Sequence, residues 1–195
     1  MLKKIFIPLM TFFFLTVLSG CADSGNTLAI QPKMTLPPVD PTMKAITINI
    51  SGVDHRQSQA LAQVNRDARL VTLVPSRDLR FLLQEVLEKQ MVARGYMIGS
   101  PSDANLQIIV NQLHANVKEG SLRHDIFAKA EISIVVYMKD GSKQTKNYRT
   151  SYNVQGPLSA TNAKIADAVN TVLSDIIADM AQDASINTFI KQNVR

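Results

Sequence analysis

Apolar and polar positions alternate along several stretches of the chain, and a period of two is typical of strands with one buried face. The alternation is longest over residues 122–136, where the even positions from Ile126 to Val136 are apolar. Shorter runs cover residues 46–50, 70–74 and 106–117. A further strand is expected before Gly156 and Pro157, which end the sheet.

The spacing of apolar residues also predicts how the strand over 122–136 pairs with the next one. A three-residue loop, 140–142, with a glycine bulge pairs Ile134 with Tyr148 and Ile132 with Thr150. This register puts the apolar side chains of both strands on one face. A two-residue turn would instead put polar residues opposite the isoleucines, so we expect the longer loop.

The pairing with the preceding strand follows from the same reasoning. A four-residue loop, 118–121, places Val117 opposite Leu122. Within 106–117 the phase of the apolar positions changes, and such a slip predicts a β-bulge near Asn111 and Gln112.

Two segments have the 3.6-residue spacing of amphipathic helices. The first opens with Ser76 as a candidate cap and ends at Gly95. The second runs from about Ser159 to Met180, with a break over 183–185 and a short amphipathic turn after it. The residues expected to face inward are Leu79, Leu82, Leu83, Val86, Leu87 and Met91 in the first helix, and Ile165, Val169, Val172, Leu173, Ile176, Ile177 and Met180 in the second.

These elements predict an α+β fold: a mostly antiparallel sheet of four to five strands with two main helices packed on one face. Residues 52–69 are polar and show no clear period, so we expect a long loop with at most a short helical turn. Long loops of this kind are often functional.

The first twenty residues have the pattern of an export signal. Lys3 and Lys4 precede an apolar stretch that is too short to span a bilayer as a helix. That stretch ends in Leu18, Ser19, Gly20 and Cys21, which resemble the lipobox of bacterial lipoprotein signal peptides. A plain secreted protein with one free thiol is the alternative, but lipidation accounts for the single cysteine.

The resemblance to a lipobox implies cleavage before Cys21, a diacylglyceryl thioether on its sulfur and an acyl chain on its amine. Several acyl chains together hold a protein at a membrane durably. In enterobacterial-type lipoproteins an aspartate directly after the cysteine favours the inner membrane. Ala22 occupies that position here, so we expect the outer membrane, on its periplasmic side.

Residues 21–43 are expected to be the acylated cysteine and a flexible tether, and residues 44–195 a single periplasmic domain. Four of the eight prolines lie between Pro32 and Pro41, and proline-rich segments prefer extended conformations. Such a tether either holds the domain away from the bilayer or only connects the two.

Charge and composition exclude several classes of function. Removing residues 1–20 takes away two lysines and no acid, which leaves 19 basic and 16 acidic residues without a basic block. The chain therefore lacks the pattern of nucleic-acid binding. With Cys21 acylated, no thiol remains for a disulfide or a thiolate metal site, and nothing in the sequence indicates a cofactor.

The sequence offers few catalytic candidates. His114 and His124 lie on adjacent predicted strands, but the register places them on opposite faces, and His55 lies in the loop. No histidine has the spacing of a zinc motif, and no nucleophile elbow or phosphate-binding loop is present. We therefore expect no enzyme and no catalytic or metal-binding residue.

Two candidate interaction surfaces remain. One is the polar face of the sheet, with Lys129, Glu131, Asn147 and Arg149. The other is the loop 52–69, with Asp54, His55 and Arg56. Either could instead be an ordinary solvated surface.

Several stretches beyond the lipobox resemble the YajG family of proteobacterial lipoproteins, and the likeness spans nearly the whole mature chain. They are residues 76–91, 94–97, 106–110, 146–149 and 151–154. The resemblance implies an outer-membrane lipoprotein and carries over no catalytic residue. The function expected is a non-catalytic interaction or adaptor module that contacts an envelope protein. The alternative is a binder of a lipid-like amphiphile or peptidoglycan fragment, held between sheet and helices.

Overall fold

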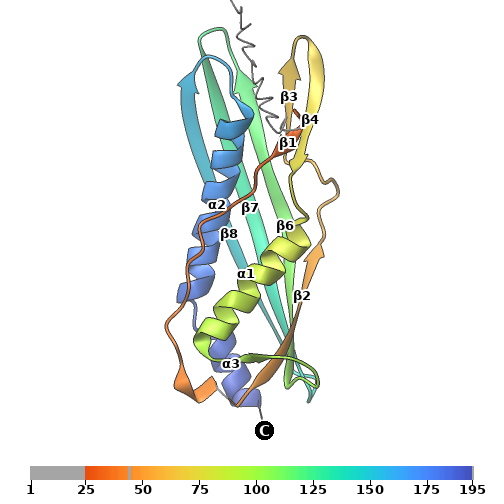
Figure 1. Cartoon of the computed structure of the whole chain (residues 1–195), viewed down its shortest axis with the longest axis vertical. Coiled ribbons are helices and arrows are strands. Elements are labelled where there is room, and N and C mark those ends of the chain that lie inside the picture. Colours follow the sequence, from red (N-terminus) through yellow and green to blue (C-terminus); the bar gives the residue numbers. More distant parts are fainter. Residues whose placement is uncertain (1–24, 44, 195) are drawn as a thin grey trace, which may run out of the picture.

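The structure, a computed structural model, describes residues 25–43 and 45–194. The predicted signal peptide and Cys21 lie outside the described residues. The elements in chain order are β1 Thr27–Leu28, the 3₁₀ turn η1 Pro41–Met43, β2 Thr47–Asp54, β3 Ala62–Arg66, β4 Arg69–Pro75, α1 Leu79–Arg94, β5 Met97–Ile98, β6 Ala104–Glu119, β7 Arg123–Met138, β8 Lys143–Pro157, α2 Asn162–Gln182 and α3 Ser185–Asn193 (Figure 1).

The strands form two sheets, and the larger one holds the core. Its order is β5-β2-β6-β7-β8. The pairs β6–β7 and β7–β8 are antiparallel, whereas β2 runs parallel to both β5 and β6. The predicted α+β class is therefore confirmed. The sheet is mixed because the chain crosses over through α1 between β2 and its two parallel neighbours, β5 and β6.

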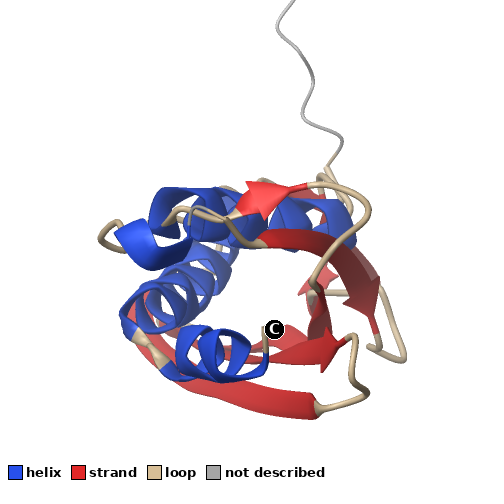
Figure 2. Ribbon diagram, turned by 90° about the horizontal axis from the view of Figure 1, so that it is seen from below, coloured by secondary structure: helices blue, strands red, loops and turns tan. Residues whose placement is uncertain are grey.

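Alternation along β7 determines which face is buried, as predicted. Ile126, Ala128, Ala130 and Ile132 are fully buried, and Val136 follows in the same phase. Their side chains pack beneath α1 and α2, which both contact the sheet from one side (Figure 2). The inward positions predicted for both helices are all buried.

The helix ends follow local capping chemistry. Asp78, rather than the predicted Ser76, caps α1, because its carboxylate accepts a hydrogen bond from the Arg80 backbone N–H. Gly95 ends the helix in the left-handed region, at a φ of 111°. Thr161 caps α2, which stops before Asp183, where a break was predicted.

The hairpin between β7 and β8 corrects the predicted register by two residues. The loop is 139–141, not 140–142, with Gly141 at a φ of 86° and Met138 bonded to Ser142. Ile132 therefore lies opposite Tyr148, and Ile134 lies opposite Lys146. A shift of two residues keeps every side chain on its predicted face.

In the hairpin between β6 and β7 the side chains also lie on their predicted faces, but the pairing register differs from the prediction. The predicted loop 118–121 is wrong, because the strands continue to a tight turn at Ser121 and Leu122. Val117 pairs with Ile126 as a result. The predicted bulge is confirmed, since the pairing shifts between Val110 and Gln112.

The predicted loop 52–69 is correct only for residues 55–61. Residues 52–54 extend β2, and residues 62–69 form β3 and its turn into β4, with Asp67 and Ala68 both at positive φ. Two such residues make the turn type that suits a tight hairpin. The period was hard to see because only Leu61, Ala62, Val64 and Leu73 in this region are buried.

The predicted flexible tether is wrong for residues 25–43, which pack along the domain as an N-terminal strap. Leu28 and Ile30 are buried in the core. Side chains satisfy the backbone of the strap: Asn170 accepts from Gln31 at 2.8 Å, Ser174 from Lys33 at 2.8 Å, and Gln90 donates to Thr35 at 2.9 Å. The extended, proline-rich backbone leaves N–H and C=O groups free for these bonds, which proline content alone does not reveal.

Candidate functional site

The outward face of β6, β7 and β8 is open, because the described helices all pack on the other side of the sheet (Figure 2). The structure brings together the four residues predicted for this face. Glu131 lies directly opposite Arg149, and their side chains form an ion pair of 2.9 Å. Lys129 lies two residues before Glu131 on β7, opposite Ser151, and Asn147 on β8 lies opposite Ser133. We call Lys129, Glu131, Asn147 and Arg149 the open-face cluster.

A row of hydrogen bonds crosses three strands beside this cluster. Asn111, the bulged residue of β6, donates its side-chain amide to the Ser133 hydroxyl at 2.5 Å. Ser133 in turn donates to Asn147 at 2.6 Å. The bulge explains the geometry, since it leaves Asn111 without a partner residue in the ladder. The row holds Asn147 in a fixed orientation on a face that solvent reaches.

The histidines are separated as predicted. His114 is on the outward face beside Lys129, and burial together with the lysine charge lowers the pKa of its imidazole. His124 is buried on the other face, where its Nδ1 lies 2.8 Å from the Leu158 carbonyl oxygen. The two rings therefore do not share a site.

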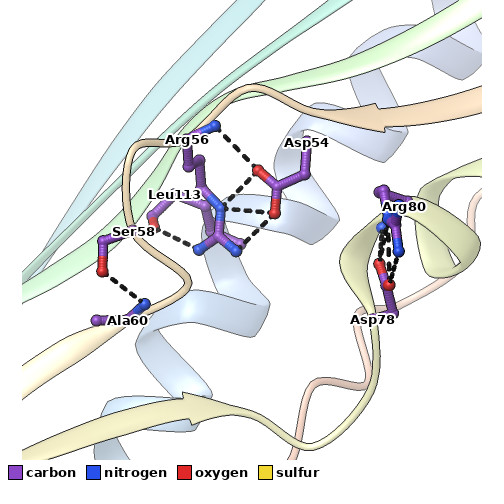
Figure 3. A network of polar contacts seen from close by, with 7 residues as sticks. All are labelled: Asp54, Arg56, Ser58, Ala60, Asp78, Arg80 and Leu113. Carbon is purple, nitrogen blue, oxygen red and sulfur yellow. Dashed lines mark hydrogen bonds and ion pairs between the residues drawn. The ribbon is translucent and has the colours of Figure 1, made fainter.

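A cleft of about 460 Å³ lies where β2 and β4 end and α1 begins. Two ion pairs line it (Figure 3). Arg56 and Asp54 form a fork-like pair with a shortest distance of 2.8 Å, and the Arg56 side chain is only 6% exposed. Arg80 pairs in the same way with Asp78, at 2.6 Å.

The backbone brings these two pairs into one cleft. Gly52 lies directly under the first turn of α1, and a Cβ there would be 2.2 Å from the Arg80 carbonyl oxygen. Only glycine allows this close approach, which places the end of β2 against the start of α1. His55 remains outside the lining of the cleft and has an exposed side chain.

The cleft offers fixed charges and no free general base. Asp78 is held ionised, because hydrogen bonds from Arg80 lower the pKa of its carboxyl and outweigh the opposing effect of burial. The Nη1 atom of Arg56 donates to the Leu113 carbonyl oxygen at 3.4 Å. Among the described residues, no group of three or more His, Cys, Asp or Glu side chains could hold a metal ion. The arrangement suits recognition through charge and hydrogen bonds.

Sequence reasoning found half of this cleft. It singled out Asp54 and Arg56, but treated Asp78 and Arg80 only as the start of a helix. The available signal was the charged run Arg77, Asp78 and Arg80 at a helix N-terminus, directly after a strand.

Beneath α1, α2 and α3 the described residues leave little space between the sheet and the helices. The hollow beneath α1, α2 and α3, beside Tyr148 and Ile186, has a volume of only about 10 Å³. A larger groove of about 370 Å³ lies at the surface between β8 and α2, lined by residues that include Tyr152, Val154 and Lys164.

None of the helices in the described part of the chain is long and apolar enough to cross a membrane.

Comparison with known proteins places this architecture in a family. A family model described as "uncharacterized lipoprotein" matches residues 32–191, which cover most of the chain. The chain belongs to this lipoprotein family. It is 56% identical over 195 residues to the uncharacterized lipoprotein YajG of Escherichia coli strain K12, with 100% of both chains covered. The YajG protein of strain O6:H1 matches equally well, so the resemblance inferred from the sequence is confirmed.

The fold is shared more widely than the sequence. The crystal structure of protein XCC0632 from Xanthomonas campestris matches with a TM-score of 0.57 at 16% identity, over 85% of this chain and 96% of that one. At this identity the likeness concerns the fold alone. Membership of a lipoprotein family supports a lipid-mediated attachment to a membrane.

Proposed function

We propose that this protein is a non-catalytic interaction module, held by acyl chains on Cys21 at the periplasmic side of the outer membrane, that binds an envelope protein through the open face of its sheet. The observation that carries the proposal is the fixed polar array on that face: the Glu131–Arg149 pair and the row from Asn111 to Asn147. The helices cover the opposite face, so this surface is not needed to complete the core.

Size and composition of the face suit a protein partner. The three strands have 16, 16 and 15 residues. At roughly 3.3 Å per residue and about 4.8 Å between strands they cover roughly 700 Å², close to the ~800 Å² that each partner buries in a standard interface. Phe127 and Tyr137 are each 40% exposed on the same face. Aromatic residues and arginine are enriched in protein interfaces.

The test is photocrosslinking in intact cells with a photoreactive residue at position 147. We expect one discrete protein adduct, which should disappear when Arg149→Glu is added in the same chain. Position 175 on α2 is the matched control, because Asp175 is exposed on the helical side. Equal adducts from both positions, or none from position 147, would refute the open face as the binding surface.

Attachment through Cys21 is tested separately. Changing Cys21→Ser should release the protein into the soluble periplasmic fraction, whereas the natural chain should fractionate with outer membranes. The position after the cysteine, Ala22, supports the outer membrane over the inner one. Unchanged membrane fractionation of the variant would contradict acyl anchoring.

A second candidate function is the binding of an amphiphile or a peptidoglycan fragment. The filled core argues against a ligand between sheet and helices, but the groove between β8 and α2 has a suitable volume. Native mass spectrometry of protein purified from membranes tests it. A bound lipid or glycan that is lost in a Val154→Arg variant, and no protein adduct from position 147, would favour this function.

A further inference from the structure

Three turns at one end of the molecule each present an exposed leucine. Leu70 follows the β3–β4 turn, Leu122 lies in the β6–β7 turn and Leu158 lies between β8 and α2 (Figure 1). Their exposures are 65%, 82% and 70%. We call these three residues the apolar pole.

Leu158 is notable for its backbone as well. It has a φ of 60°, in the left-handed region that favours glycine or asparagine. The fold holds a large apolar side chain in a strained conformation and points it at solvent. Such an outlier suggests a role outside the core.

Hydrogen bonds join the three turns into one rigid surface. Arg66, at the end of β3, forms an ion pair of 3.0 Å with Glu119 of β6 and also donates to the Ala160 carbonyl oxygen. The Glu119 carboxylate accepts a bond of 2.8 Å from the Ala160 backbone N–H. Leu158 donates its own N–H to the Leu122 carbonyl oxygen at 3.0 Å. The leucines therefore keep their relative positions without packing against a core.

Basic side chains border the pole. Arg69 precedes Leu70 and Arg123 follows Leu122, and both are exposed, as is Lys118. The exposed acids in the same turns are Asp67 and Glu119, and the ion pair with Arg66 neutralises Glu119. An apolar tip with a basic rim has the chemistry of an interfacial membrane contact, where leucines enter the acyl boundary and cations meet anionic headgroups.

The chain enters the domain beside the same pole. The side-chain amide of Asn162, at the start of α2, donates to the Gly25 carbonyl oxygen at 3.0 Å. Cys21 precedes Gly25 by four residues, which span at most about 14 Å. If the acyl chains are on Cys21, as the proposed function requires, the bilayer surface lies within that reach of this end of the domain.

We infer that the apolar pole rests on the bilayer that holds the acyl chains, with Leu70, Leu122 and Leu158 inserted at its surface. The domain then stands on the membrane along its long axis. The β7–β8 turn and α3, at the opposite end, face away from the lipid (Figure 1). The open face of the sheet is left to the side, accessible to a partner.

The test uses the full-length acylated protein in vesicles of phosphatidylethanolamine and phosphatidylglycerol. Because Cys21 is the only cysteine in the sequence and is blocked by acylation, a Leu122→Cys variant carries one thiol for a fluorescent label. Leu70→Cys and Leu158→Cys repeat the measurement on the other turns. Lys143→Cys, an exposed position beside the β7–β8 turn, is the matched control.

We expect labels at the pole to be quenched by brominated lipid and shielded from iodide in the water, and the label at position 143 to show the reverse. Equal iodide quenching at positions 122 and 143, in protein that still floats with the vesicles, overturns the inference and leaves the anchor intact. Shielding from iodide without quenching by brominated lipid also overturns it, since a second copy or another protein would then cover the pole. If the unlabelled protein fails to float, the anchor fails, and the inference with it.

Discussion

The two faces of the large sheet are built from the same strands, yet different forces maintain them. On β7, Ile132 is fully buried under the helices, whereas its neighbour Glu131 lies on the open face in an ion pair with Arg149. On the face covered by the helices, tight packing and the exclusion of water favour apolar side chains of fitting size. Charge pairing and hydrogen bonds order the second, where solvent weakens each contact. Stability should therefore depend on the covered face, and binding on the open one.

The largest effect is expected from a charge on the covered face. Ile132→Asp places a carboxylate where no polar partner is available, which should destabilise the fold by more than about 4 kcal/mol. The measurement is urea unfolding followed by circular dichroism, on the Cys21→Ser background so that the protein is soluble. Glu131→Ala is the control one residue away, with an expected midpoint near that of the parent. A folded Ile132→Asp variant with the parent's midpoint would show that the faces are misassigned.

A smaller but still large effect is expected where the covered side buries a charge. The Arg94 guanidinium donates to the carbonyl oxygens of Met180, Ala181 and Asp183, at 2.9 to 3.0 Å, and so caps the end of α2. Burial lowers the pKa of this guanidinium. Arg94→Leu removes the donors and leaves buried carbonyls unsatisfied, which should cost about 2–4 kcal/mol in the free energy of unfolding.

The control for this change is Arg94→Lys, which keeps the charge but has fewer donors in a different geometry. We expect its stability to fall between those of the parent and Arg94→Leu in the same urea titration. If Arg94→Leu is as stable as the parent, the arginine does not cap α2.

The residues of the two faces could be predicted from the sequence because the alternation of apolar and polar positions is a local property of each strand. Ile126 to Val136 share one phase, and a register error of two or four residues in either hairpin leaves that phase unchanged. The exact loops were wrong because several turns satisfy the same alternation. Only the backbone hydrogen bonds of the Gly141 and Leu122 turns distinguish them.

The strap and the cleft could not be obtained from local pattern. The strap bonds to Asn170 and Ser174, about 140 residues away in sequence, and nothing in its prolines indicates that contact. The cleft depends on the approach of α1 to Gly52, which is also long-range. Asp54 and Arg56 were singled out for their charge, and that signal did not extend to Asp78.

An ionic contact at the edge of the covered face should make stability depend on pH. Asp183 is partly buried, which raises the pKa of its carboxyl, but bonds from Lys146 and Ser185 outweigh this and lower the pKa to about 2. A folded-state pKa below the ordinary value of 3.8 stabilises the fold above about pH 4, and this contribution is lost as the pH falls towards 2.

Asp183→Asn should therefore lower the free energy of unfolding by about 1–2 kcal/mol at pH 7. The difference from the parent should shrink between pH 5 and pH 2, as measured by urea titrations across that range. A difference that stays constant with pH would mean that the carboxylate charge is not what stabilises this corner.

The smallest effect on stability is expected on the open face, and it is the one that sharpens the comparison most. The Arg149 side chain is largely exposed, and the Glu131 carboxylate that it contacts raises the pKa of its guanidinium. Solvent screens an exposed pair of this kind. Arg149→Ala should therefore leave the unfolding midpoint unchanged within error, while it abolishes or strongly reduces the adduct formed from position 147. Asp175→Ala, an exposed change on α2 outside the open face, should alter neither quantity. A lower unfolding midpoint in Arg149→Ala would mean that the open face also stabilises the fold. The assignment of stability to the covered face and of binding to the open face would then be wrong.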